Sequence, residues 1–220
     1  MSDAGIAGEI VKWGRSLFER GLSPGGSGNI SARTSSGFIA TPTSVCLGFL
    51  NVDALSRLDA AGGHVAGDRP TKEWPLHAAF FKSEADIGAV VHLHSTYATL
   101  VSCLADIDPS DPLPPMTPYV TMRVGRSPVI PYVRPGSNEV GPLVDALTGG
   151  CRAVLLANHG PIVGGPTVEA AVFAAEELEE AAKLMILAQG RMVRRLTRAD
   201  IAELTTVFGS PGATTPLGRG

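Results

Sequence analysis

The stretch Gly88-Ala-Val-Val-His-Leu-His94 is a short apolar run that ends in two histidines. Its length and its paired valines favour a buried strand. Because alternate residues of a strand face the same side, His92 and His94 are expected to point toward one place. That geometry suits a metal ion, but it also occurs with ordinary polar histidines, so the pair by itself leaves both interpretations open.

A second apolar run, Arg152-Ala-Val-Leu-Leu-Ala-Asn158, leads directly to His159 and predicts another strand with a histidine at its end. Functional side chains in α/β proteins collect on the loops at strand ends. Three neutral imidazoles leave a divalent ion such as Zn²⁺ an open position, which is typical of catalytic zinc sites. The third histidine therefore strengthens the metal interpretation.

Helices and strands alternate through the rest of the chain. The pattern predicts helices over residues 3–20, 70–82, 95–104, 139–148 and 168–196, a strand after the glycine-rich loop 22–31, and further strands near 37–41, 50–58 and 127–132. Five prolines make residues 106–118 an irregular loop. This alternation predicts one α/β domain whose central sheet is covered by helices. It leaves open whether the strands run parallel or antiparallel.

Composition narrows the class of protein. Of the 220 residues, 44% are hydrophobic and 18% charged, so the chain is expected to fold as one globular domain. Its net charge of −3 disfavours a nucleic-acid partner. Three separated cysteines favour a reducing compartment, and no apolar run reaches the length of a membrane span. We expect a cytoplasmic protein without a membrane partner, with a domain at 1–208 and a mobile tail at 209–220.

Glu73 lies in the first turn of the helix expected after Pro70. Helix N-termini present free N–H groups and favour anions. A carboxylate turned from there toward a metal is a fourth ligand or a general base, whereas one turned outward is merely solvated. His77 follows one turn later on the same helix face. We interpret His77 as a polar residue of the helix surface rather than as a rival ligand.

Three turns carry hydroxyl groups and glycines: Gly25-Gly-Ser-Gly-Asn-Ile-Ser31, Thr41-Pro-Thr-Ser44 and Pro70-Thr-Lys72. Glycines let backbone N–H groups approach an anion, and the side chains add further donors. The first turn lacks the Gly-Lys-Ser/Thr of a Walker A loop. Three such turns beside one metal would make a site for a phosphorylated sugar.

Five stretches, in this order, resemble the class II aldolase/adducin family, and the resemblance covers about residues 5–208. They are Ser27-Gly-Asn-Ile-Ser-Ala-Arg33, Thr41-Pro-Thr-Ser44, Pro70-Thr-Lys-Glu73, Val90-Val-His-Leu-His-Ser95 and Leu155-Leu-Ala-Asn-His-Gly160. The resemblance implies a class II aldolase-like three-layer α/β/α fold with a central, largely antiparallel sheet. It also implies a homotetramer whose sites lie between subunits.

The same resemblance implies roles for particular residues. One zinc ion per subunit would be held by His92, His94 and His159. Glu73 would be the catalytic acid/base and would also touch the metal when substrate is absent. The substrate phosphate would be bound at Gly28, Asn29, Thr43, Ser44, Thr71 and Lys72. The family's sugar-phosphate aldolases usually have two serines where this chain has Thr71-Lys72, and the lysine could add a cation to the phosphate pocket.

Four further stretches are similar to the family's 3-oxo-tetronate 4-phosphate decarboxylase branch: Leu93–Thr99, Pro115–Tyr119, Met122–Pro128 and Pro131–Gly136. This implies decarboxylation of a phosphorylated sugar acid, 3-oxo-tetronate 4-phosphate, to dihydroxyacetone phosphate and CO₂ through a metal-stabilised enediolate. The alternatives are a sugar-phosphate aldolase of the fuculose 1-phosphate type and a pentulose-phosphate 4-epimerase. A non-catalytic adducin-like interaction domain is disfavoured because the three histidines and Glu73 are all present.

Two residues are assigned to the parts of the site that the family pattern does not cover. A decarboxylase needs a donor for the substrate carboxylate, and a guanidinium matches it with two parallel N–H bonds. Arg123 and Arg126 lie in the stretch that is similar to the decarboxylase branch, and we favour Arg123 in that role. Some aldolases close the site with a tyrosine of the C-terminal tail, but no tyrosine follows Tyr132 here. Tyr119 is the residue that we expect to reach the site of a neighbouring subunit.

Overall fold

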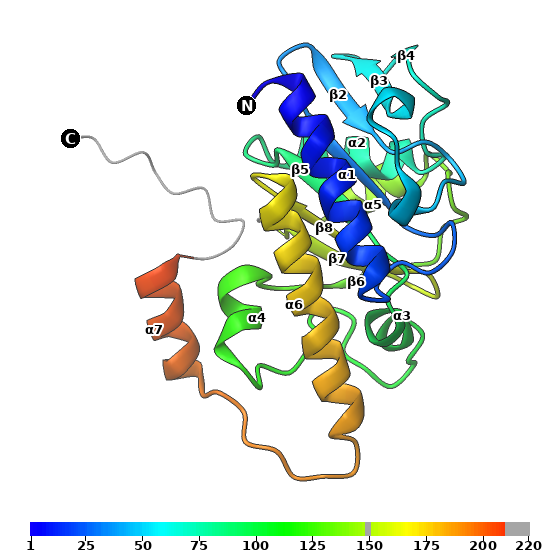
Figure 1. Cartoon of the computed structure of the whole chain (residues 1–220). Coiled ribbons are helices and arrows are strands. Elements are labelled where there is room, and N and C mark those ends of the chain that lie inside the picture. Colours follow the sequence, from blue (N-terminus) through cyan, green and yellow to red (C-terminus); the bar gives the residue numbers. More distant parts are fainter. Residues whose placement is uncertain (148–150, 210–220) are drawn as a thin grey trace, which may run out of the picture.

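A mixed, eight-stranded sheet runs through the computed structural model, which describes residues 1–147 and 151–209 (Figure 1). Its strands lie in the order β4-β3-β2-β1-β5-β8-β7-β6. The strands are β1 (Asn29–Arg33), β2 (Gly37–Ala40), β3 (Ser56–Asp59), β4 (His64–Ala66), β5 (Ala89–His92), β6 (Val129–Ile130), β7 (Ala153–Leu156) and β8 (Gly160–Gly165). Neighbours are antiparallel except for the parallel pair β6–β7. The largely antiparallel sheet implied by the family resemblance is therefore confirmed.

Helices cover both faces of the sheet. They are α1 (Asp3–Glu19), α2 (Trp74–Ser83), α3 (Thr96–Ser102), α4 (Pro118–Arg123), α5 (Val140–Asp145), α6 (Val168–Leu187) and α7 (Arg198–Phe208), with 3-10 turns at Leu47–Phe49 and Val52–Ala54. One core joins α1, α3 and α6 to the sheet, and α1 and α6 lie side by side there in Figure 1. A second core joins α2 and α5 to the opposite face. This is the three-layer arrangement that we expected.

Small residues set the close packing of the longest helix. Thr167 caps α6 by accepting a hydrogen bond from the Ala170 N–H at 3.1 Å. Alanines on its buried face leave room for the sheet to approach. At the end of β8, a Cβ on Gly165 would lie 2.7 Å from the Ala171 nitrogen. A glycine is therefore required where strand and helix meet.

Several expected elements differ from those observed. The helix expected to reach residue 196 ends at Leu187, close to Gly190 with its positive φ of 75°, and a separate helix, α7, follows. Residues 50–58 contain a 3-10 turn before the strand begins. Neither α4 nor β8, with its three glycines and one proline, was expected from the sequence pattern. Of the expected helix 139–148, residue 148 lies outside the described residues, as do residues 210–220 of the expected mobile tail.

No helix in the described ranges, residues 1–147 and 151–209, is long and apolar enough to cross a membrane.

Candidate metal centre and substrate pocket

The end of β5 brings the first two histidines to the middle of the sheet. His92 is the last residue of β5 and is paired with Asn29 of β1 on one side and with Ile162 of β8 on the other. His94 follows just beyond the strand, before α3 begins. The Nδ1 atom of His92 lies 2.8 Å from the Pro161 carbonyl oxygen, which leaves its Nε2 atom 3.1 Å from Nε2 of His94.

The turn between β7 and β8 supplies the third histidine. Asn158 adopts a left-handed conformation with φ of 57°, and Gly160 has φ of 149°. A Cβ on Gly160 would lie 2.5 Å from the Leu93 carbonyl oxygen, so only glycine allows the turn to pass this close to the end of β5. The result is that the ring centroid of His159 lies 4.8 Å from that of His92 and 4.9 Å from that of His94.

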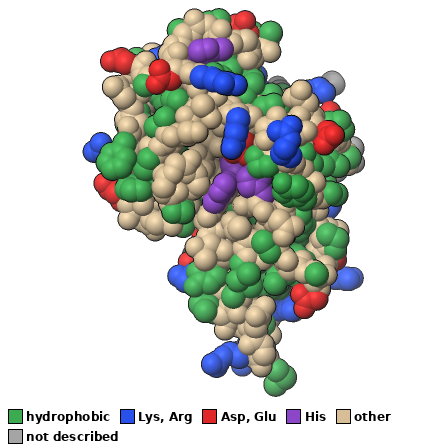
Figure 2. Space-filling model, turned by 90° about the vertical axis from the view of Figure 1, so that its right-hand side faces the viewer, with side chains coloured by type: hydrophobic (Ala, Val, Ile, Leu, Met, Phe, Trp, Pro, Cys, Tyr) green, Lys and Arg blue, Asp and Glu red, His purple; other side chains and the backbone are tan. Residues whose placement is uncertain are grey.

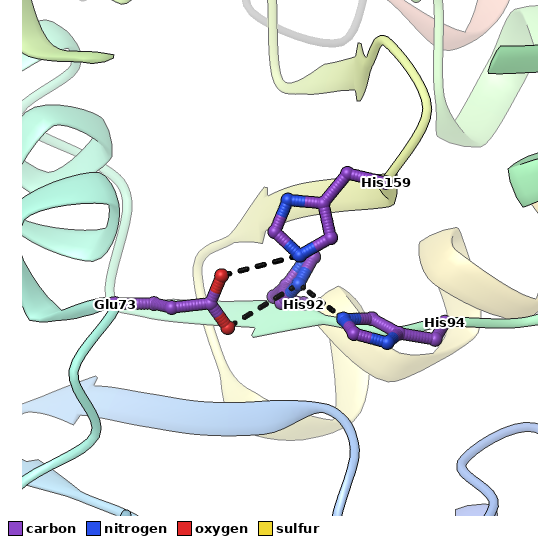
Figure 3. Close-up of side chains that lie close together, drawn as sticks. All are labelled: Glu73, His92, His94 and His159. Atoms are coloured by element: carbon purple, nitrogen blue, oxygen red, sulfur yellow. Dashed lines mark hydrogen bonds and ion pairs between the residues drawn. The ribbon is translucent and has the colours of Figure 1, made fainter. Parts of the chain in front are cut away.

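The carboxylate of Glu73 completes the cluster from the opposite side, as Figure 3 shows. Glu73 is the N-cap of α2, one position before the first turn in which we expected it. Its Oε1 atom lies 3.3 Å from Nε2 of His159, and its Oε2 atom lies 3.5 Å from Nε2 of His92. The four ligand atoms of Glu73, His92, His94 and His159 all lie within 4.8 Å of one another.

The donor set fits a divalent metal ion. Two ligand atoms that are each about 2.0–2.1 Å from a tetrahedral zinc ion stand about 3.3–3.4 Å apart. The distances between ligand atoms in the cluster, at 3.1, 3.3 and 3.5 Å, are close to that spacing. A histidine that donates its second N–H to a backbone carbonyl, as His92 does to Pro161, is the usual arrangement around metal-binding imidazoles.

The local electrostatics keep the histidines neutral and the carboxylate ionised. Burial lowers the pKa of His92 to about 3 and also lowers the pKa values of His94 and His159. Burial by itself raises the pKa of Glu73, but the neighbouring His92 and the hydrogen bond from Asn29 lower it more, so the net pKa is below that of an ordinary glutamate. Neutral imidazoles and an ionised carboxylate are the forms that bind metals.

His77 is not a residue of the helix surface, and that expectation is wrong. It is fully buried because the side of α2 that carries it packs on β1. Its Nδ1 atom lies 2.6 Å from the hydroxyl of Ser31, and its Nε2 atom lies 2.5 Å from the Asn29 side-chain oxygen. Burial lowers its pKa to about 4. Alternation along β1 could have indicated this contact, because Asn29 and Ser31 face the same side of the strand.

The three hydroxyl-bearing turns come together beside the cluster. The Thr71 N–H donates to the Thr41 carbonyl at 3.1 Å, which joins the third turn to the second. The first turn lies against the second, because a Cβ on Gly26 would be 3.6 Å from the Ser44 carbonyl oxygen. Gly28, with φ of 75°, also approaches the His92 carbonyl, since a Cβ there would lie 3.1 Å from it.

The structure therefore brings the expected phosphate-binding residues to one side of the cluster. Thr71 is buried, and its hydroxyl accepts the Glu73 backbone N–H at 3.2 Å. Lys72 is exposed and close enough to lower the pKa values of His94 and His159, after the larger effect of burial. Asn29 directs its amide to the Glu73 carboxylate at 2.8 Å. In Figure 2 the histidines lie in a hollow with basic side chains beside them.

A pocket beside Glu73 and His159 contains an arginine that was not among the residues expected from the sequence. The pocket is lined by Glu73, His159 and the segment 133–137, and a Cβ on Gly136 of this segment would lie 2.8 Å from the Lys72 carbonyl oxygen. Arg134 is the only basic residue among the described residues that line it. Its segment belongs to the stretch Pro131–Gly136 that resembles the decarboxylase branch, so a signal for Arg134 was present in the sequence.

Arg123 and Tyr119 lie on α4, apart from this pocket. The Arg123 guanidinium stands 5.8 Å from the centre of the Phe173 ring and lines a groove that includes none of the four clustered residues. The Tyr119 side chain is exposed. The structure therefore does not bring either residue to the cluster of its own chain, and their expected roles stay predictions that depend on a neighbouring subunit.

A largely antiparallel sheet between helix layers, with three histidines and a glutamate gathered where the central strands end, defines an α/β protein of the metalloenzyme type. The chain belongs to the family described as "Class II Aldolase and Adducin N-terminal domain", which it matches over residues 8–186. The family resemblance expected from the sequence is thereby confirmed.

Three related proteins show where the chain falls within this family. It is 46% identical to a 3-oxo-tetronate 4-phosphate decarboxylase of Pectobacterium atrosepticum, over 90% of this chain and 91% of that protein. It is 31% identical to an L-fuculose phosphate aldolase of Escherichia coli, over 94% and 95% of the two chains. The solved structure of Klebsiella pneumoniae YgbL, described as an aldolase, epimerase or decarboxylase, matches with a TM-score of 0.89 and 41% identity, covering 93% of this chain and 99% of that one.

Proposed function

We propose that this protein is a metal-dependent carboxy-lyase that converts 3-oxo-tetronate 4-phosphate to dihydroxyacetone phosphate and CO₂. The single observation that carries the proposal is that the Glu73–histidine cluster adjoins both the hydroxyl-bearing turns and the pocket that contains Arg134. The substrate has a phosphate at one end and a carboxylate at the other. The relationship to decarboxylases at 46% identity supports the same reaction.

The metal would be held by His92, His94 and His159, with Glu73 as a further ligand when no substrate is present. When bound, a divalent ion such as Zn²⁺ supplies Lewis acidity to the substrate carbonyl next to the bond that breaks. The bond between C1 and C2 of the substrate breaks, its electron pair stays with C2, and C1 leaves as CO₂. A proton must then reach C2, and we propose that Glu73, which is ionised in the free site, takes up a proton from water and passes it to C2.

The phosphate end of the substrate is assigned to the three adjoining turns. Gly28, Thr43, Ser44 and Thr71 offer backbone N–H groups and hydroxyls there, and Lys72 adds a positive charge. Asn29 has one amide N–H committed to Glu73, and its second N–H is available to a ligand. These residues would bind the substrate without taking part in bond breaking.

The carboxylate end of the substrate is assigned to Arg134. A carboxylate that is about to leave must be oriented beside the metal and Glu73, and Arg134 shares a pocket with Glu73 and His159. Arg123 stays an alternative only if it is contributed by another subunit. The guanidinium should orient this carboxylate without binding it too tightly, because tighter binding of the ground state alone would not speed the reaction.

An aldolase activity is the second candidate, and it is supported by the 31% identity to the fuculose phosphate aldolase. An aldolase breaks the corresponding carbon–carbon bond but releases an aldehyde in place of CO₂. The two reactions share dihydroxyacetone phosphate as a product, so the other product distinguishes them.

The decisive experiment incubates the purified, zinc-loaded protein with 3-oxo-tetronate 4-phosphates of both C2 configurations and, separately, with fuculose 1-phosphate. We expect equal amounts of CO₂ and dihydroxyacetone phosphate from at least one oxo-acid, and little cleavage of fuculose 1-phosphate. Preferential release of an aldehyde from fuculose 1-phosphate would replace the decarboxylase assignment with the aldolase one.

The assembly and cellular location belong to the same proposal. We expect a homotetramer in the cytoplasm, with each site completed by a neighbouring subunit. Exposed apolar side chains on α4 and α7, namely Tyr119, Val207 and Phe208, support burial of this region against another copy of the chain.

A further inference from the structure

A chain of buried hydrogen bonds leads from β1 to the Glu73 carboxylate. The Ser31 hydroxyl lies 2.6 Å from Nδ1 of His77, and Nε2 of His77 lies 2.5 Å from the Asn29 side-chain oxygen. The Asn29 amide nitrogen then donates to Oε2 of Glu73 at 2.8 Å. Ser31, His77 and Asn29 are all buried, so water does not compete for these groups.

The chemistry of the four groups fixes the direction of every hydrogen bond. An ionised carboxylate only accepts, so Asn29 must turn its NH₂ group toward Glu73 and its oxygen toward His77. The Asn29 oxygen only accepts, so Nε2 of His77 carries the hydrogen. A neutral imidazole has its other nitrogen unprotonated, and Nδ1 therefore accepts from the Ser31 hydroxyl. All three donors point toward Glu73.

This directed chain prevents the Asn29 amide from turning over. A flipped amide would place its oxygen against the Glu73 carboxylate and its NH₂ group against the N–H of His77. Leaving a buried donor or acceptor without a partner is destabilising, and the flipped amide would do so at both of its ends. The Glu73 carboxylate and the N–H of His77 therefore together fix which way Asn29 faces.

We propose that His77 and Ser31 are positioning residues, which act through Asn29 to hold the Glu73 carboxylate in one orientation beside the histidine cluster. Oε2 of Glu73 is held by Asn29, and Oε1 is directed at His159. The effect on turnover rests on the proposed function, whereas the direction of the hydrogen bonds does not. The two parts therefore have separate tests.

The direction of the chain is tested by nitrogen NMR of the zinc-loaded protein with ¹⁵N-labelled histidine. We expect a neutral His77 ring with its hydrogen on Nε2, identified by the signal that disappears in His77→Gln. The Asn29→Ala variant should alter this signal, because it removes the acceptor of Nε2. A His77 ring with its hydrogen on Nδ1 would reverse the chain and overturn the proposal, whatever reaction the enzyme performs.

The effect on turnover is tested with His77→Leu, His77→Gln and Ser31→Ala. We expect His77→Leu to lower kcat by about 10- to 100-fold with full zinc content and little change in KM, because such losses are typical of groups that orient a metal ligand. His77→Gln should recover much of this loss, since its amide can donate to Asn29. Ser31→Ala should lower kcat by a few-fold only, and it keeps the test available if His77→Leu fails to fold.

A double variant separates positioning from general damage. If His77 acts through Asn29, the Asn29→Ala/His77→Leu protein should be no slower than Asn29→Ala alone. Phe80→Leu, a buried change one turn further along α2, is the matched control and should lower stability without lowering kcat. Multiplied losses in the double variant, or an equal kcat loss in Phe80→Leu, would show that His77 only supports the fold. An inactive wild type would instead refute the proposed function.

Discussion

At the scale of single residues, His92 and Glu73 each use one polar atom for a hydrogen bond to the surrounding protein and turn another polar atom toward the cluster. His92 directs Nδ1 to the Pro161 carbonyl and Nε2 to His94. Glu73 accepts a hydrogen bond from Asn29 and faces His159 with its other oxygen. A side chain anchored at one atom keeps the other in place, so binding needs little reorganisation. We therefore expect metal binding and turnover to respond separately to substitution.

Replacing His92 by alanine should remove both metal and activity, whereas Glu73→Gln should keep the metal and lose turnover. His92→Ala deletes a ligand, and we expect metal content to fall by about 10-fold or more. Glu73→Gln keeps the size of the side chain but cannot transfer the proton, and we expect a rate loss on the order of 10²–10⁴. Elemental analysis beside steady-state kinetics measures both. Full metal in His92→Ala, or near wild-type rates in Glu73→Gln, would contradict the assignments.

The two arginines should differ in their effect on the oxo-acid. Arg134→Ala removes the cation that shares the pocket of Glu73 and His159, so we expect kcat/KM for the oxo-acid to fall at least 10-fold. Binding of inorganic phosphate, measured by competition, should stay nearly unchanged in the same variant. Arg123→Ala is the comparison variant, and its kcat/KM for the oxo-acid should fall as far only if Arg123 reaches the site of a neighbouring subunit. Unchanged kinetics in Arg134→Ala would remove it from the substrate pocket.

His77 should make the stability of the fold depend on pH. Its pKa is about 4 in the folded protein and 6.5 without burial, so below pH 6.5 the unfolded chain binds a proton that the folded protein does not. Stability is therefore complete above pH 6.5 and falls as the pH approaches 4. When the pH is lowered from 7.5 to 4.5, the free energy of unfolding measured with denaturant should fall by about 2 kcal/mol more in wild type than in His77→Gln. Equal losses would mean that His77 is not buried as a neutral ring.

At the scale of elements, the site depends on how closely two strand ends approach each other. The turn that carries His159 passes the end of β5 where a Cβ on Gly160 would lie 2.5 Å from the Leu93 carbonyl. The same strand end carries His92 and His94. The separation of the three imidazoles is therefore set by backbone contact between β5 and the β7–β8 turn, and the side chains only complete it.

Gly160→Ala should consequently weaken metal binding without touching a ligand. The added methyl group meets a backbone oxygen, and φ of 149° is strained for any L residue, so we expect a loss of about 1–3 kcal/mol in stability. Zinc affinity should fall in a chelator titration because His159 is displaced. Gly8→Ala in α1 is the control, since nothing lies within 4 Å of a Cβ there, and it should be neutral or stabilising. Equal behaviour of the two variants would argue against backbone control of the site.

The sequence predicted the elements whose signal is local. The Ser2 cap and the apolar spacing of α1, the buried runs of β5 and β7, and the Thr167 cap of α6 are all properties of neighbouring residues. β8 was missed because its glycines and proline disfavour a strand, and it forms where β5 and β7 pair with it on both sides. The end of α6 was missed because residues 188–196 still carry helix-forming side chains.

In the candidate site, too, the features with a local sequence signal were predicted and those that depend on distant contacts were not. Clustering of the three histidines could be expected because each ends a predicted strand. The burial of His77 depends on the contact of α2 with β1, and the place of Arg134 depends on the path of residues 131–137 past Glu73. Both contacts join segments that are far apart in the chain. The sequence therefore predicted the metal cluster and the turns beside it, but not the burial of His77 or the pocket position of Arg134.

At the scale of the whole molecule, the core that joins α1, α3 and α6 to the sheet is covered by these helices. Beside it, α4 and α7 contact each other and leave apolar side chains exposed. None of the residues of α7 is buried in the single chain. A helix without a buried face is stabilised when another surface covers it.

We therefore expect a tetramer that depends on α7. Light scattering of the full chain should give four times the mass of one chain, and Val207→Glu/Phe208→Glu should reduce both that mass and the specific activity. The reason is that two exposed apolar residues at the end of α7 would place charges in a subunit contact. Lys12→Glu, an exposed change on α1, is the control. A monomer with full activity would refute the expectation that sites are shared between subunits.

The wall of the pocket that carries Arg134 has a consequence for how such enzymes diversify. It follows β6, the short edge strand of the sheet, whereas the histidines come from β5 and the β7–β8 turn in its interior. After gene duplication, a copy can lengthen or recompose residues 131–137 without shifting the register of any central strand. Changes in this one short loop can thus admit substrates with other leaving groups, while selection retains the residues that act at the bond that breaks.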